Sequence, residues 1–343
     1  MKYYLPSAKE KIIEELDTDT RHQNLLRFCA KAFAKTDLSY RSGYQFYFTE
    51  PLIELCEPQS GEKNFDLLLF NESTKGAIFI ECKSSIPSKA SKTIKDVEKA
   101  ITLVQRNLDY LSGIIDIKIL NENTEYVLCI YDKDLRKMEE SFKGKAKSSN
   151  NSGFDPNRIK IWVYKPHSEL IQLYINQLHN NLELSNMLLK GFDEKNSKSR
   201  FELPYVCSSH KFLIIQNAII GGCYRKNMRN QLQQDPKIIK QKDIISILHN
   251  NLSLGMPKEK ESDLLNEIVS HVIKYGEKYK LLEKTNEEEI RLICQGNRID
   301  LVLKNIKDKF LKNWIEEKSE EWAKAEALKQ YIKRTGMKQL SDF

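Results

Sequence analysis

The feature that most constrains the fold is a pair of short apolar runs that read as the two arms of a β-hairpin. Residues 65–70 (FDLLLF) and 77–83 (AIFIECK) flank the polar stretch NESTKG. Apolar runs of this length bounded by turn residues favour strands over helices. A loop centred between Ser73 and Thr74 pairs residues whose numbers sum to 147, which sets Asp66 opposite Glu81.

The surrounding sequence predicts a mixed α/β layer. Helices are expected over 7–36 and 92–111, where apolar residues recur at helical spacing, and further strands over 43–56, 125–132 and 158–165. The three strands up to residue 83 are expected to form an antiparallel meander. The order helix, three strands, helix, strand (αβββαβ) is that of an α/β sheet core.

The rest of the chain reads as mainly helical. A helix is expected over 168–190, and the polar run 191–200 is expected to separate a domain of residues 1–190 from one of residues 191–343. Helices over 241–251 and 262–282 precede two apolar runs that flank Gly296-Asn297, a hairpin signal, and a last helix is expected over 307–334. Two helices followed by a hairpin are the layout of a winged helix.

The composition limits the cellular location and the kinds of partner that we expect. The net charge of +7 is compatible with a polyanionic partner, although it does not by itself identify one. No apolar run approaches the length of a membrane helix, and the seven cysteines show no CxxC pair. These features predict a cytoplasmic protein with no membrane partner.

The charged residues of the hairpin predict a metal site. Glu81 and Lys83 share a sheet face because side chains alternate along a strand, and Asp66 joins them through the pairing above. Two carboxylates this close repel each other unless a cation lies between them, and Mg²⁺ prefers oxygen ligands. A cation can activate water and polarise a phosphoryl oxygen, while a lysine contacts phosphate well. The set outlines a site for phosphodiester hydrolysis.

Asp66 followed by Glu81-Cys82-Lys83 at the end of an apolar strand resembles the PD-(D/E)xK nuclease superfamily, which includes many restriction endonucleases. The resemblance covers about residues 7–165. It implies a restriction-endonuclease-like core, Asp66 and Glu81 as ligands of Mg²⁺ (or Mn²⁺ as its substitute), and Lys83 as the catalytic lysine. Phe65 stands where the family name has proline.

Further candidates come from the helices. The family sometimes adds an acidic residue from the first helix, for which Glu14 and Glu15 are both candidates. Gln105 lies beside the apolar stripe of its helix, from which it could point toward the site. The Gln-x-x-x-Tyr motif of RecB-like members is not matched, because Tyr110 comes five positions after Gln105.

The chain carries a second Asp…Glu-x-Lys match that tests how much the spacing alone means. Asp300 is followed by Glu316 and Lys318, but these two fall among apolar residues at helical spacing. Residues two apart on a helix do not share a face, so we expect a solvated helix surface there. For the first match, the corresponding alternative is a surface ion pair on an edge hairpin, which would contribute only about 0 to 1 kcal/mol.

The sequence thus predicts a metal-dependent endodeoxyribonuclease that cuts duplex DNA, of the type II restriction kind. Its expected DNA contacts in the winged-helix segment are Lys258, Lys260, Lys274, Arg291 and Arg298. The resemblance also implies a homodimer, with one active site for each strand. Two alternatives stay open: a transposon-end or repair nuclease of the same superfamily, and a non-catalytic nucleic-acid-binding protein that retains the fold.

Overall fold

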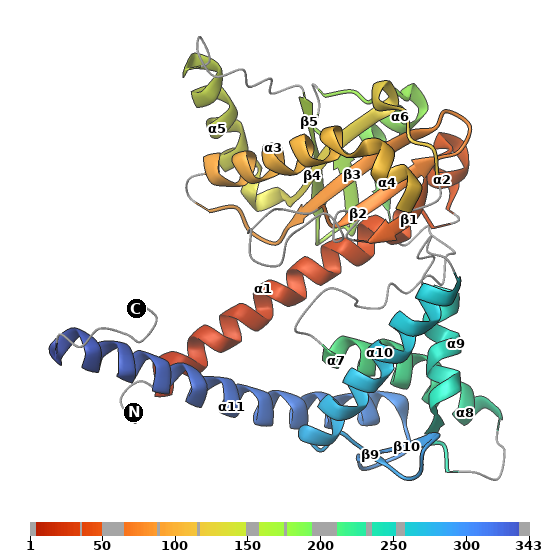
Figure 1. Ribbon diagram of the computed structural model, residues 1–343, viewed down its shortest axis with the longest axis vertical. Coiled ribbons are helices and arrows are strands. Elements are labelled where there is room, and N and C mark those ends of the chain that lie inside the picture. The colour runs from red at the N-terminus through yellow and green to blue at the C-terminus, as the bar shows by residue number, and fades with distance from the viewer. Residues whose placement is uncertain are drawn as a thin grey trace. The chain divides into compact units, whose positions relative to one another are not determined.

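The predicted hairpin is present and belongs to a seven-stranded sheet with strand order β1-β2-β3-β4-β5-β6-β7 (Figure 1). The computed structural model describes residues 5–34, 36–49, 65–87, 90–114, 117–148, 158–174, 177–193, 211–230, 235–251 and 258–335. Contacts divide the chain into two units. The sheet unit comprises Arg21–Cys207 with His249–Leu264, and the helical unit comprises Met1–Thr20, Ser208–Leu248 and Leu265–Phe343.

The sheet is mixed, which confirms the α/β prediction. Its strands are β1 (Gln45–Thr49), β2 (Leu67–Asn71), β3 (Gly76–Lys83), β4 (Thr124–Tyr131), β5 (Ile159–Lys165), β6 (Leu170–Leu173) and β7 (Phe192–Asp193). The first three strands pair antiparallel, as the meander prediction requires. β3, β4 and β5 pair parallel to one another, and the last two strands pair antiparallel again.

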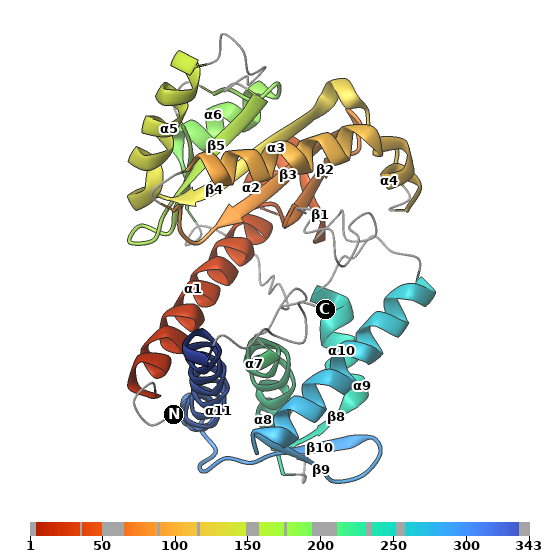
Figure 2. The same cartoon turned by 60° about the vertical axis from the view of Figure 1, so that its left-hand side comes forward.

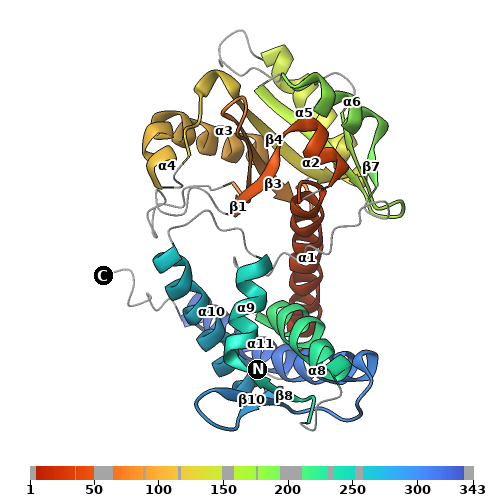
Figure 3. The ribbon, with the colours of Figure 1, turned by 90° about the vertical axis from the view of Figure 1, so that its right-hand side faces the viewer.

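Helices cover both faces of this sheet, as Figure 3 shows from the side. The helices of the sheet unit are the second half of α1 (Leu5–Ala32), α2 (Asp37–Ser42), α3 (Ser91–Arg106), α4 (Leu108–Ile114), α5 (Leu135–Ser148) and α6 (Leu182–Lys190). α1, α2 and α6 share one apolar cluster with the strands, and α3 lies across the opposite face (Figure 3). Cover on both faces explains why β2 and β3 are nearly continuous apolar runs.

The helical unit contains a small antiparallel sheet of order β8-β10-β9. Its elements are α7 (Lys211–Ile214), the π-helix η7 (Ile215–Tyr224), α8 (Arg225–Asn230), β8 (Ile238–Lys240), α9 (Gln241–Asn251) up to Leu248, α10 (Lys258–Lys278) from Leu265, β9 (Leu282–Lys284), β10 (Glu289–Leu292) and α11 (Ile299–Thr335). The first part of α1 is counted with this unit, where the ammonium of Lys11 lies 4.5 Å from the centre of the Trp322 ring.

Two predictions about the elements were wrong. Residues 168–190 are not one helix but the strand β6 followed by the helix α6. The runs flanking Gly296 do not form a hairpin, because the second one begins α11; the hairpin of this unit is β9–β10 instead. The main segment of the sheet unit ends at Cys207, whereas the sequence placed the division within residues 191–200, and the first twenty residues group with the C-terminal unit. Among the described residues, no helix is long and apolar enough to cross a membrane.

Candidate active site

Asp66 lies at the point where the hairpin pairing becomes irregular. The predicted register is confirmed from Leu67, which pairs with Ile80, to the turn. One residue earlier, the backbone amide of Asp66 donates to the carbonyl oxygen of the same Ile80 at 2.9 Å. Asp66 is therefore not the regular partner of Glu81 that the sequence predicted. Its carboxylate Oδ2 instead accepts a hydrogen bond from the backbone N–H of Cys82 on β3, at 2.6 Å. Cys82 has no partner residue on β2, which begins at Leu67.

The same carboxylate is contacted by a histidine that the sequence reasoning missed. His22 Nε2 of α1 lies 3.4 Å from Oδ2 of Asp66. His22 precedes Leu25, Leu26 and Cys29 by three, four and seven residues, so helical spacing places it on the face of α1 that packs on the sheet. That spacing is a signal the sequence contained, a polar residue continuing an apolar stripe.

Glu81 and Lys83 form a contact pair at the end of β3. Lys83 Nζ donates to Glu81 Oε1, and the Glu81 side chain is only 11% exposed. Burial raises the pKa of Glu81, and the nearby charge of Asp66 raises it further, to about 8, against the opposing effect of Lys83. Glu81 therefore binds a proton far more readily than an ordinary glutamate.

The two basic groups of the site have their pKa values raised. Burial lowers the pKa of Lys83, but the charge and hydrogen bond of Glu81 outweigh that effect. Burial likewise lowers the pKa of His22, and the hydrogen bond and charge of Asp66 more than compensate. Two carboxylates, an imidazole and an ammonium group thus form one electrostatically coupled cluster, all in the sheet unit.

The donor chemistry of this cluster fits a divalent cation. Carboxylate oxygens are the ligands of Mg²⁺, and an added imidazole nitrogen also suits Mn²⁺. A cation would offset the repulsion between Asp66 and Glu81 that raises the pKa of Glu81. Among the described residues, His22, Asp66 and Glu81 do not form a set whose ligand atoms all lie within 4.8 Å of one another. For all three to share one ion, at least one of these side chains would have to move, and Glu81 is paired with Lys83 as it stands.

The other predicted site residues lie elsewhere. Gln105 is exposed at the end of α3, where its side-chain oxygen accepts a hydrogen bond from Arg158 rather than pointing at the acidic pair. Glu14 and Glu15 are exposed on the part of α1 that belongs to the helical unit. They precede His22 by eight and seven residues, roughly 10 to 12 Å along a helix. Of these α1 residues, His22 is the one that contacts Asp66.

Two of the predicted DNA contacts are held in ion pairs with aspartates. Lys274 is exposed on α10, whereas Arg291 lies 3.2 Å from Asp235 and Arg298 lies 2.9 Å from Asp300 in ion pairs. The side chains of Lys258 and Lys260 lie outside the described residues.

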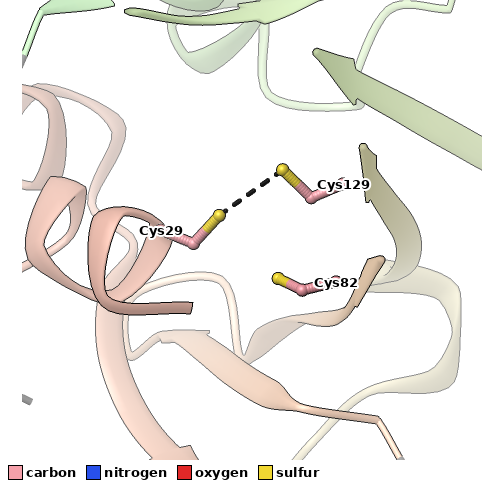
Figure 4. Close-up of side chains that lie close together, drawn as sticks. All are labelled: Cys29, Cys82 and Cys129. Atoms are coloured by element: carbon pink, nitrogen blue, oxygen red, sulfur yellow. Dashed lines mark hydrogen bonds between the residues drawn. The ribbon is translucent and has the colours of Figure 1, made fainter. Parts of the chain in front are cut away.

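A second cluster of potential ligands lies in the core beneath the site. The thiols of Cys29, Cys82 and Cys129 come from α1, β3 and β4 and turn toward one another (Figure 4), with all three sulfurs within 4.8 Å of each other. Cys29 Sγ lies 3.5 Å from Cys129 Sγ, and each residue is 0% exposed. Burial raises the pKa of all three thiols well above its ordinary value. Because metals bind the thiolate, this dry cluster is better suited to packing as small apolar groups.

Comparisons with known proteins add one relative. A protein of Archaeoglobus fulgidus, described as uncharacterized, is 24% identical over 345 residues, which cover 96% of this chain and 92% of the relative. No protein-family model matches the sequence. No solved structure matches it significantly.

Proposed function

We propose that this protein is a divalent-cation-dependent endonuclease of the PD-(D/E)xK kind that hydrolyses phosphodiester bonds in duplex DNA. The observation that carries the proposal is the cluster at the end of the central hairpin. Asp66, Glu81 and Lys83 are distant in sequence from His22, yet all four are coupled electrostatically. The element order αβββαβ and the register of the hairpin support a restriction-endonuclease-like core.

In this proposal Asp66, Glu81 and His22 hold Mg²⁺ or Mn²⁺. The bound cation supplies Lewis-acid stabilisation of the charge that develops on the phosphodiester oxygens. Asp66 is held in place by the amide of Cys82 and by His22, so its carboxylate is oriented before any ligand arrives. Orientation of this kind reduces the reorganisation needed during the reaction.

In this proposal Lys83 is the catalytic lysine and is not a ligand of the ion. In the free protein its ammonium group is occupied by Glu81. With Glu81 as a ligand of the cation, the ammonium group would be available to orient the attacking water or to contact a phosphate oxygen. The raised pKa keeps Lys83 positively charged at neutral pH, as this role requires.

In this proposal the helical unit is the part that binds DNA. A helix, a strand, two helices and a two-stranded hairpin, with sheet order β8-β10-β9, follow one another as in a winged helix. A homodimer that cuts one strand with each active site belongs to the same proposal.

Cleavage of supercoiled plasmid by the purified full-length protein tests the function. We expect nicking and linearisation that require Mg²⁺ or Mn²⁺ and stop in EDTA. Defined ends would indicate a restriction-type enzyme, and cutting only with partner proteins would indicate the transposon-end or repair alternative. DNA binding without metal-dependent cleavage under any of these conditions would refute the nuclease and leave the non-catalytic alternative.

A further inference from the structure

The helical unit distributes its charge unevenly along the chain. Residues 225–242 and 298–312 together contain eleven lysines and arginines against three aspartates, an excess of eight, whereas the whole protein has a net charge of +7. Residues 265–291, which include most of α10 and the β9–β10 hairpin, contain five lysines and arginines against six glutamates. The positive charge of this unit therefore lies on α8, β8 and the first half of α11.

Hydrogen bonds connect the first basic segment and its flank to residues 294–297, which directly precede the second. The hydroxyl of Tyr224, which immediately precedes α8, donates to the carbonyl oxygen of Asn297, just before α11, at 2.5 Å. Lys237 Nζ donates to the carbonyl oxygen of Cys294 at 3.0 Å. Lys237 and Lys309 both act on the Cys294 thiol, lowering a pKa that burial raises. The start of α8, β8 and the first turns of α11 thus meet around residues 294–297. Both helices belong to the helical unit, and Figure 2 draws them in the lower part of the view.

The two arginines of α8 face outward from this framework. Asn227 anchors the helix, because its side-chain amide donates to the carbonyl oxygen of Ile238 at 2.9 Å. Arg225 and Arg229 are each two residues from Asn227, which places both on the opposite side of the helix, and both are exposed. Lys226 is also exposed and lies 3.8 Å from Asp243 in a weak surface ion pair.

The hairpin that would be the wing of a winged helix has the opposite charge. The turn between β9 and β10 carries the exposed Glu287 and Glu288, and the exposed face of α10 carries Glu267 and Glu277. Such side chains repel the phosphate backbone that a recognition helix and wing would approach.

We propose that the helical unit binds the phosphate backbone of duplex DNA through the α8–α11 surface, defined by Arg225, Arg229, Lys304 and Lys309, and not through α10 and the β9–β10 hairpin. The inference rests on the proposed function for the choice of DNA as the polyanion. Of the five DNA contacts predicted from sequence, only Arg298 lies near this surface, because it directly precedes α11.

Binding of a labelled DNA duplex to the full-length protein in EDTA, followed by fluorescence anisotropy over a range of salt concentrations, tests this inference without cleavage. The double variant Arg225→Gln/Arg229→Gln should bind about tenfold more weakly. The slope of log binding constant against log salt concentration should be shallower by about two, since each lost phosphate contact removes about 0.9 from that slope. The matched variant Lys274→Gln/Lys284→Gln, which removes two exposed lysines of α10 and β9, should bind as the wild type does.

Equal effects of the two double variants, or a larger effect of the second, would overturn the inference, as would wild-type protein that fails to bind duplex DNA or prefers single-stranded RNA. The two proposals can fail separately. Charge-dependent binding without metal-dependent cleavage removes the nuclease and leaves this surface. Cleavage unaffected by Arg225→Gln/Arg229→Gln, with unaltered binding, removes this surface and leaves the nuclease.

Discussion

His22 Nε2 on α1 lies 3.4 Å from Oδ2 of Asp66, which joins a helix on one face of the sheet to the start of β2. If His22 is a ligand, His22→Ala should weaken Mn²⁺ binding about tenfold and Mg²⁺ binding much less, because imidazole suits transition metals and Mg²⁺ prefers oxygen. Isothermal titration calorimetry with each ion measures both affinities. His271→Ala, which removes an exposed histidine of α10, is the control. Unaltered Mn²⁺ affinity in His22→Ala would exclude the imidazole from the site.

Glu81 should make the metal-free protein less stable as pH rises. Its pKa is about 8 in the folded protein, against an ordinary value of 4.5. Between these values the folded protein keeps a proton that the unfolded chain loses, so the stability due to Glu81 is fully present below about pH 4.5 and is lost as pH rises through about 8. A difference of one unit in pKa corresponds to about 1.4 kcal/mol.

Urea unfolding of the wild type and of Glu81→Gln in EDTA measures this effect. The free energy of unfolding of the wild type should fall relative to that of Glu81→Gln across that pH range, by a few kcal/mol on the same scale. Adding Mn²⁺ should reduce the fall, because the cation stabilises the ionised carboxylate. A difference between the two proteins that does not vary with pH would mean that Glu81 is an ordinary carboxylate.

Lys83→Met should separate cation binding from catalysis. The variant removes the ammonium group that occupies Glu81, so Mn²⁺ should bind at least as tightly as in the wild type. Cleavage should nevertheless fall by about 100-fold or more, since a charge that stabilises the transition state is lost. Lys99→Met on the exposed side of α3 serves as the matched control. If Lys83→Met cleaves at the wild-type rate, the lysine has no catalytic role.

The three core thiols should resist modification while the protein is folded. Cys29, Cys82 and Cys129 are 0% exposed and their pKa values are raised, so little reactive thiolate forms. Iodoacetamide labelling followed by peptide mass spectrometry should show Cys294, which is partly exposed, reacting before any of them. Labelling of the three at a rate above that of global unfolding would contradict the packing described here.

The parts of the fold that depend on neighbouring residues in the sequence could be predicted from it. The register of the β2–β3 hairpin followed from two apolar runs and a short polar turn, and it is confirmed from Leu67 onward. The irregular pairing at Asp66 could not be predicted from the hairpin alone. It depends on two contacts of the Asp66 carboxylate, one with the backbone amide of Cys82 on β3 and one with His22 on a helix distant in sequence.

The errors in the helical unit came from a turn signal taken without its context. Gly296 does adopt a positive φ of 72°, as a tight turn requires, but the residues after it have helical apolar spacing and begin α11. Two of the predicted DNA contacts, Arg291 and Arg298, lie in the runs of that misplaced hairpin. Charge counted along whole elements, rather than at single lysines, points to α8 and α11 instead.

The most direct test compares the proposed site with the second Asp…Glu-x-Lys match of the same chain, which serves as a decoy. Asp300 and Lys318 match the same Asp…Glu-x-Lys pattern, but both lie on α11, where Lys318 contacts Glu321. Plasmid cleavage in Mg²⁺ or Mn²⁺ is measured for the wild type, Asp66→Ala, Lys83→Ala, Asp300→Ala and Lys318→Ala. The account predicts cleavage by the wild type and both decoy variants, and a loss of about 100-fold or more in the other two. No cleavage by the wild type, or equal cleavage by all five proteins, would contradict it.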